Sequence, residues 1–259
     1  MIRKILLRNK TLYWLGAIHF ILFMGLLLYA PFNTMVVLGI NSVIKPMKFA
    51  LSIWVFSWTM ALILHYVHAV HKVKNYSRAA AVAFGFEQLA ITSQALRGEL
   101  SHFNKTTPFN SILYALMGVF IVSITLWTAY MTYIFIKQKT CMLPPTIVLS
   151  IKIGLIYCVI FSLFGGYVSG LEGHTVGAKD GGEGLWFLNW SKAFGDLRVA
   201  HFFGIHSLQI IPVFGILAEE ISTDSHLSVK AVWLFSLAYL SYILFTMVQG
   251  LMGLPFMRF

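Results

Sequence analysis

Charged side chains are scarce in this sequence, and acidic ones are the scarcest. Only 11% of the 259 residues are charged, with nine Asp and Glu against nineteen Lys and Arg, whereas soluble domains have about 25%. Hydrophobic residues make up 58%, and the mean hydropathy is +0.78. This composition excludes an ordinary soluble domain. It predicts an all-α integral membrane protein with one polytopic membrane domain over 1–259.

Cysteines and soluble-enzyme motifs are also lacking. The only two cysteines, Cys141 and Cys158, lie at the start of one apolar run and inside it, too far apart along a helix for a disulfide. The redox compartment therefore cannot be read from them. The sequence has no Walker loop, no dinucleotide-binding fingerprint and no nucleophile elbow, so nothing in it points to those enzyme classes.

The excess of basic residues gives a net charge of +10, which raises the question of nucleic acid. A nucleic-acid reader gathers its basic residues on one soluble surface. Here they lie mostly between apolar runs, where Lys and Arg set topology and meet anionic lipid headgroups. We therefore expect the lipid bilayer as partner and no nucleic acid.

Seven apolar segments are long enough to cross a bilayer. They cover residues 11–32, 46–67, 79–103, 109–136, 144–169, 197–217 and 230–252. The first is longer than a signal-peptide core and lacks a cleavage site, so it is interpreted as an uncleaved span. With the N-terminus inside, ten basic residues flank spans on the cytoplasmic side and eight on the outer side. This modest bias predicts an inside N-terminus and an outside C-terminus.

The stretch 195–212 places polar residues inside an apolar helix. At about 100° per residue, Arg198, His201, His206 and Gln209 share one helix face. Such groups are costly in hydrocarbon, so the face should point into the protein or a watery cavity. The segment 79–103 presents a second polar face, with Glu87, Gln94, Arg97 and His102 among its members.

Under the predicted topology, these two faces meet at the outer side with the lysines that follow the interfacial or re-entrant segment 31–45. The predicted pocket has a positive field suited to a small anionic or protonatable ligand. Its residues are Lys45, Lys48, Gln94, Arg97, His102, Arg198, His201, His206 and Gln209. The alternative is that each residue is satisfied locally or, for Lys45 and Lys48, reaches lipid headgroups.

A second polar layer is expected nearer the cytoplasmic side. His19, Glu87 and Lys152 each lie about 12 Å into their spans by the helical rise. A Glu87–Lys152 pair would neutralise two charges that the bilayer penalises singly. The layer is either a structural ion pair or part of a proton path.

Histidines within or near the spans also raise metal or haem binding. The candidates are His102, His201 and His206, and His102 with His201 could supply two axial haem ligands. The signal is weak, because His201 and His206 are five residues apart instead of the three or four that suit one metal. The functions left open are ligand binding or transport, a haem- or metal-dependent membrane oxidoreductase, and a non-catalytic assembly or sensor subunit.

Several local motifs together resemble a family of uncharacterised bacterial multi-pass membrane proteins. They are KPMKF at 45–49, RGELSHFN at 97–104, and the stretch from HTVG at 174 through NWS to GDLRVAHFFGIHSLQ ending at 209. The resemblance covers most of the chain. It implies location in the bacterial inner membrane and carries no activity with it.

Overall fold

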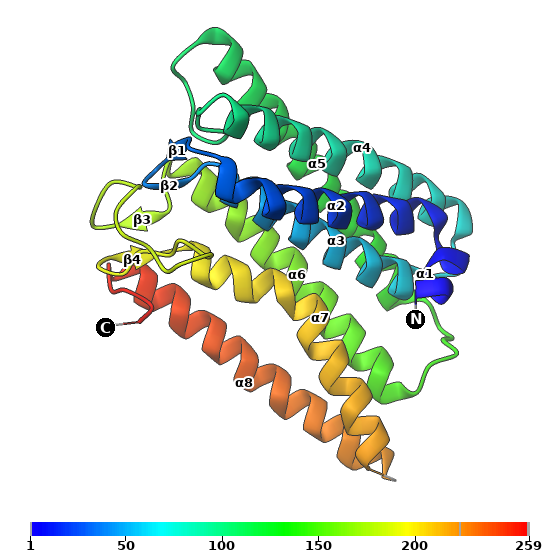
Figure 1. Ribbon diagram of the computed structural model, residues 1–259. Helices are drawn as coiled ribbons and strands as arrows, with labels where there is room; N and C mark the ends of the chain where they lie inside the picture. Colours follow the sequence, from blue (N-terminus) through cyan, green and yellow to red (C-terminus); the bar gives the residue numbers. More distant parts are fainter. Residues whose placement is uncertain (1, 223, 258–259) are drawn as a thin grey trace. The chain divides into compact units, whose positions relative to one another are not determined.

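The computed structural model describes residues 2–222 and 224–257, and these form eight α-helices and four two-residue strands (Figure 1). The helices are α1 (Ile2–Arg8), α2 (Lys10–Tyr29), α3 (Ile44–Leu64), α4 (Val70–Leu96), α5 (Pro108–Lys137), α6 (Pro145–Gly170), α7 (Arg198–Ile221) and α8 (Ser225–Leu251). A 3-10 turn, η1 (Ala30–Phe32), follows α2. The strands pair as β1 (Val36–Val37) with β2 (Ile40–Asn41) and β3 (Thr175–Val176) with β4 (Gly195–Asp196), both antiparallel.

Six of these helices are long and apolar enough to cross a membrane: α2 extended through η1, α3, α5, α6, α7 and α8. The all-α fold is therefore confirmed, and the six apolar helices are compatible with a multi-pass membrane protein. The helix α4 has ample length at 27 residues, but its polar side chains keep it outside the apolar set. A seventh span and the sidedness of the termini stay predictions.

The contacts of the chain divide it into two compact units, and each is described by itself. Unit 1 comprises Met1–His65, Val70–Trp127 and Asp180–Asn189. Unit 2 comprises Tyr66–Ala69, Thr128–Lys179 and Trp190–Phe259. The division runs through α5 and through the long loop between α6 and α7, so both segments contribute residues to each unit.

In unit 1, the antiparallel helices α2 and α3 pack along each other (Figure 1). Gly16 allows this approach, because a Cβ at that position would overlap the ring of Trp58. The indole of Trp58 donates to the Tyr13 carbonyl over 3.1 Å, and Phe20 contacts Trp54 with ring centroids 4.4 Å apart. Aromatic packing thus fixes the pair that carries the first two spans.

A short hairpin occupies the segment between α2 and α3 that the sequence predicts to be interfacial or re-entrant. Leu38 and Gly39 both have positive φ, at 50° and 76°, as a tight turn requires. The Asn33 amide donates to Asn41 Oδ1 over 2.7 Å, and Asn41 donates to the Ala30 carbonyl over 2.9 Å. These bonds pair polar groups of the hairpin and hold the segment that leads into α3.

The end of α4 corrects the sequence prediction for 79–103. The helix ends at Leu96, and Gly98 follows with φ +70°. The amide of Glu99 donates to the Gln94 carbonyl over 2.9 Å, which closes the helix with a glycine cap. Residues 97–107 therefore form a loop, and the helical angles predicted for His102 do not apply.

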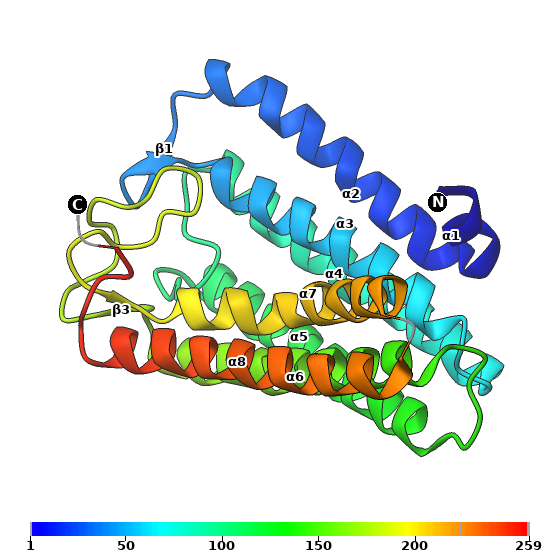
Figure 2. The same ribbon diagram turned by 90° about the horizontal axis from the view of Figure 1, so that it is seen from below.

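In unit 2, small residues bring α6 and α7 close together, and α8 lies along α7 (Figure 2). The position of a Cβ on Gly165 is filled by the His201 ring, and that on Gly204 by Phe161. Ser207 donates to the Gly154 carbonyl over 3.1 Å. Near the end of α6, Gly165 thus allows the close contact with α7.

Candidate functional site

The most unusual polar contact in unit 1 joins a buried carboxylate to a half-buried histidine. Glu87 on α4 is 1% exposed, and its Oε1 lies 3.6 Å from His102 Nε2. The His102 side chain keeps 24% of its surface exposed. The loop that follows α4 folds back to make this contact, since Gly98 reverses the chain. His102 therefore stands between solvent and a buried acid.

The other ring nitrogen of His102 contacts Lys45, in the first turn of α3. Lys45 Nζ lies 3.1 Å from Nδ1, and Ser101 Oγ lies 3.2 Å from the same atom. An ammonium group can only donate. Nδ1 therefore accepts, and the proton of a neutral imidazole stands on Nε2, facing Glu87. A lysine, a histidine and a glutamate thus form one polar chain.

Aromatic rings hold the histidine of this chain in place. The centroids of Phe49 and Tyr114 each lie 5.9 Å from the imidazole centroid. Behind them, the Gln88 amide donates to the Pro46 carbonyl over 3.2 Å, which ties α4 to the start of α3. The rings limit the positions His102 can take, as a preorganised site requires.

Two buried acceptor atoms beside the polar chain of Lys45, His102 and Glu87 have no hydrogen-bond partner among the described residues. They are Glu87 Oε2 and Gln88 Oε1. Buried polar atoms are nearly always bonded, so each is a place where water or a ligand atom would be stabilised. The site therefore combines a fixed cation, a titratable ring and unused acceptors.

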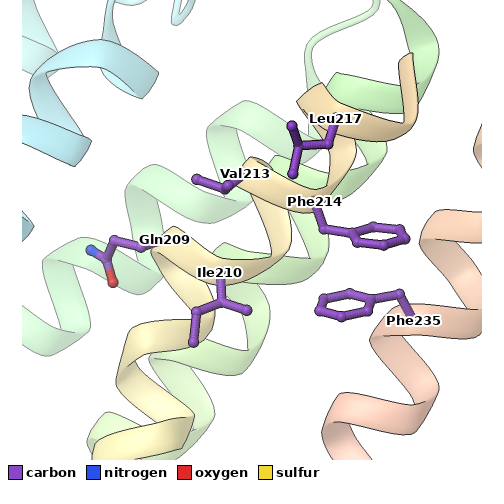
Figure 3. A pocket seen from close by; sticks show the side chains of 6 residues that line it. All are labelled: Gln209, Ile210, Val213, Phe214, Leu217 and Phe235. Carbon is purple, nitrogen blue, oxygen red and sulfur yellow. The ribbon is translucent and has the colours of Figure 1, made fainter. Parts of the chain in front are cut away.

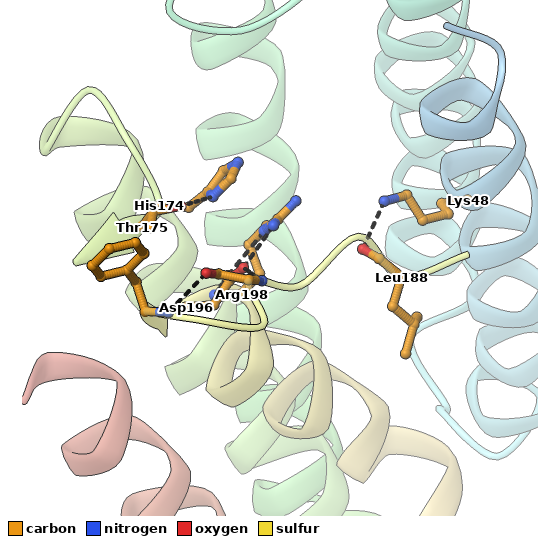
Figure 4. A network of polar contacts seen from close by, with 8 residues as sticks. Lys48, His174, Thr175, Leu188, Asp196 and Arg198 are labelled. Atoms are coloured by element: carbon orange, nitrogen blue, oxygen red, sulfur yellow. Dashed lines mark hydrogen bonds and ion pairs between the residues drawn. The ribbon is translucent and has the colours of Figure 1, made fainter. Parts of the chain in front are cut away.

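The remaining predicted residues of unit 1 have structural contacts. Lys48 donates to the Leu188 carbonyl over 3.0 Å, as Figure 4 shows. Gln94 donates to Asn110 over 2.9 Å and accepts from Arg97 over 2.7 Å, and the Arg97 guanidinium lies 5.1 Å from the centre of the Phe109 ring. These bonds fix the loop after α4 to the start of α5.

In unit 2, Arg198 is engaged by an acid that the sequence analysis leaves out of the pocket. Asp196 is 1% exposed and accepts from Arg198 Nε over 2.9 Å and Nη2 over 2.6 Å (Figure 4). It also accepts from the backbone amides of Ser191 and Arg198. Burial would raise the Asp196 pKa, but the hydrogen bonds and charge of Arg198 outweigh it and hold that pKa below its usual value.

The histidines of α7 are also satisfied within unit 2. His201 Nδ1 lies 2.7 Å from the Phe161 carbonyl. His206 Nδ1 lies 3.2 Å from Gln209 Oε1, and its ring contacts Phe202 with centroids 4.4 Å apart. These partners support the alternative in which such residues are locally satisfied.

An open groove of about 340 Å³ lies between α7 and α8 (Figure 3). It is lined by Gln209, Ile210, Val213, Phe214, Leu217 and Phe235. Phe214 and Phe235 stack with centroids 4.0 Å apart. With Gln209 as its single polar residue, the groove lacks the charge of the predicted anion pocket.

The predicted inner layer is divided between the units. His19 is buried in α2, and its Nδ1 lies 2.7 Å from the Leu15 carbonyl. Lys152 lies on α6, in unit 2. Within unit 1, Glu87 Oε1 lies 3.6 Å from His102 Nε2. The two residues of the predicted Glu87–Lys152 pair belong to different units, and the pair stays a prediction.

The histidines and acidic side chains do not form a metal or haem site in the described residues. Across residues 2–222 and 224–257, no group of three His, Cys, Asp or Glu side chains could hold a metal ion. Both nitrogens of His102 already face protein groups, Lys45 and Ser101 on one side and Glu87 on the other. The arrangement at His102 therefore does not fit an axial haem ligand.

Comparison with known proteins adds no further constraint. No protein-family model, no curated protein and no solved structure matches this chain. Bacterial origin and the inner-membrane location stay predictions, and the function has to be argued from the site itself.

Proposed function

We propose that this chain is a multi-pass membrane protein that binds a small anionic or protonatable ligand, with Lys45 and His102 as the binding groups. The observation that carries the proposal is the chain from Lys45 through His102 to the buried Glu87. The ligand is the kind of molecule that a fixed ammonium and an imidazole recognise together: a small carboxylate or an inorganic oxyanion.

The depth of burial supports a ligand site over a surface ion pair. Glu87 is 1% exposed, and burying a carboxylate is costly unless function or a good partner retains it. The 3.6 Å between Glu87 Oε1 and His102 Nε2 is too long for a full hydrogen bond. The carboxylate is therefore not closed off by its partner.

The proposal includes the topology on which access depends. We place α4 as a seventh span, since its 27 residues suffice in length and its polar groups Glu87, Gln88 and Gln94 are buried in the protein. With the N-terminus inside, Lys45 and His102 lie at the outer side. The ligand then enters from the extracytoplasmic side of a bacterial inner membrane.

Thermal unfolding of the purified protein in detergent tests the proposal. Succinate, inorganic phosphate and sulfate are added separately at equal ionic strength, with chloride as the reference salt. At one hundred times its dissociation constant, a ligand stabilises the folded state by about 2.7 kcal/mol. We expect at least one of these anions to raise the Tm and His102→Ala to abolish the increase.

The matched control is His71→Ala, because His71 is an exposed histidine of α4 outside the polar chain. This variant should respond to the anion as the wild type does. Equal responses of His102→Ala and the wild type would place the anion elsewhere and overturn the proposed site. A Soret band in the same preparation would contradict the proposal in favour of a haem protein.

A further inference from the structure

We infer that anion binding is coupled to proton uptake, with Lys45 controlling access of a proton to His102 and Glu87 receiving it. The inference rests on the proposed function and adds its coupling ion. It makes the protein a proton-coupled anion binder or symporter. It is carried by the order of Lys45, His102 and Glu87 and by the second oxygen of Glu87, which has no hydrogen-bond partner among the described residues.

The contact with Lys45 fixes the tautomer of His102. Lys45 Nζ lies 3.1 Å from His102 Nδ1, and an ammonium offers only donors. While that contact lasts, Nδ1 cannot take up a proton. The imidazole then holds its proton on Nε2, next to Glu87 Oε1 at 3.6 Å, and no net transfer can begin.

An anion changes this arrangement through charge. The Lys45 ammonium is attracted far more strongly to an anionic oxygen than to a neutral imidazole nitrogen. Once Lys45 turns to the anion, Nδ1 becomes available to hydronium from the aqueous phase. A proton is thus admitted only when the anion is present.

The proton reaches Glu87 from solvent in two transfers. A hydronium ion gives a proton to Nδ1, forming an N–H bond and leaving water. The imidazolium then loses its other proton from Nε2 to Glu87 Oε1, so one N–H bond breaks and one O–H bond forms. The ring ends neutral with its proton on Nδ1, and the buried carboxylate is neutralised while Lys45 is balanced by the anion.

From Glu87, the proton can move further toward the cytoplasmic side. The second oxygen of Glu87, Oε2, has no hydrogen-bond partner among the described residues. His19 is buried at 4% exposure, and its ring neighbours the backbone of Phe84 on α4. Phe84 precedes Glu87 by three residues, about 4.5 Å along the helix. His19 is therefore the group to receive the proton next, through water held between the two side chains.

The charged and titratable groups around Glu87 come from each neighbouring segment of unit 1. Lys45 belongs to α3, His102 to the loop after α4, and His19 to α2. Tyr114 on α5 contacts the imidazole with centroids 5.9 Å apart. These four groups influence when Glu87 gains its proton.

Calorimetric titration in two buffers of different ionisation enthalpy separates binding from proton uptake. The full-length protein in detergent is titrated with succinate and, separately, with phosphate. For the wild type, we expect a binding heat that differs between the buffers, because proton uptake is supplied by the buffer. Glu87→Gln should bind the anion with a heat that no longer depends on the buffer.

Two further variants make the test specific. His102→Gln keeps an acceptor for Lys45 but lacks the imidazole that helps bind the anion and relays the proton, so it should bind more weakly and with a heat that does not depend on the buffer. Glu99→Gln is the control, because Glu99 lies in the same loop and accepts from Asn104 over 3.0 Å; its heats should match the wild type. These variants keep the test valid if Glu87→Gln fails to fold.

The outcomes separate the inference from the function on which it rests. No binding heat with either anion in both buffers would overturn the proposed function, and the coupling with it. A wild-type heat that is the same in both buffers would leave anion binding intact and overturn the coupling alone. Unchanged buffer dependence in both Glu87→Gln and His102→Gln would likewise overturn the coupling.

Discussion

Replacing Arg198 by alanine should destabilise unit 2 far more than removal of an exposed arginine does. The buried Asp196 carboxylate accepts four hydrogen bonds, two from the Arg198 side chain and two from backbone amides. The variant removes the side-chain pair and the counter-ion together. Removing one partner of a buried ion pair lowers the free energy of unfolding by about 3–5 kcal/mol.

Two features of the structure reduce this cost. The Arg198 side chain is 26% exposed, so part of its charge is screened by solvent. The two backbone donors still solvate the carboxylate after the substitution. We therefore expect a loss of about 2–3 kcal/mol. At about 2–4 °C per kcal/mol for a chain of this size, the Tm should fall by about 4–12 °C.

The assay is thermal unfolding in detergent, with Arg78→Ala as the control because Arg78 is exposed. Arg198→Lys should recover only part of the loss, since a point charge cannot reproduce the bidentate guanidinium contact. Because the folded-state pKa of Asp196 is lowered, the pair stabilises the protein above the unfolded value of about 3.9. That contribution is lost as the pH falls through the folded pKa, so the Tm gap between wild type and Arg198→Ala should narrow there. Equal melting of Arg198→Ala and Arg78→Ala at neutral pH would refute the reasoning.

Two other predictions test the helix packing and the topology. Gly165→Val should lower the Tm, because a Cβ at this position would overlap the His201 ring. Gly166→Ala should have little effect, because a Cβ there meets nothing within 4 Å. Similar losses of Tm for the two variants would contradict the packing. Cysteines introduced in the loop 171–196 should react with an impermeant thiol reagent added to intact cells, and one beside Lys139 should not. The reverse labelling would invert the topology and place Lys45 and His102 at the cytoplasmic side.

The helices follow from the sequence because apolar runs of spanning length are a strong and local signal. Each predicted segment overlaps one long helix, and the boundary errors have identifiable causes. The residues after the true end of α4, RGELSHF at 97–103, are polar but fit one helical face by angle, so periodicity alone hides the stop. Gly98, with its positive φ, ends the helix. Helical periodicity takes no account of this glycine.

The partners of the polar residues are harder to predict, because they depend on contacts between distant segments. Glu87 and Lys152 are suggested as a pair because they lie at a similar depth in their predicted spans. Depth alone does not show that the chain turns back after Leu96 and brings His102 to Glu87. The bidentate contact of Arg198 with Asp196 involves neighbours two residues apart, yet helical periodicity assigns Asp196 no role, since it lies just before the helix. Phe49 and Tyr114 carry no sequence signal at all, since aromatic residues are common in every span.

The central claim is that His102 is a ligand-binding residue, and nitrogen NMR of histidine-labelled protein tests it most directly. His102→Gln identifies the His102 signals by their loss, and succinate and phosphate are then titrated in separately. The account predicts that, without anion, Nδ1 of His102 is unprotonated and Nε2 carries the proton. It predicts that at least one anion shifts these signals to saturation, and that Lys45→Met abolishes the shift. Signals of His102 that stay fixed while those of other histidines respond would contradict it.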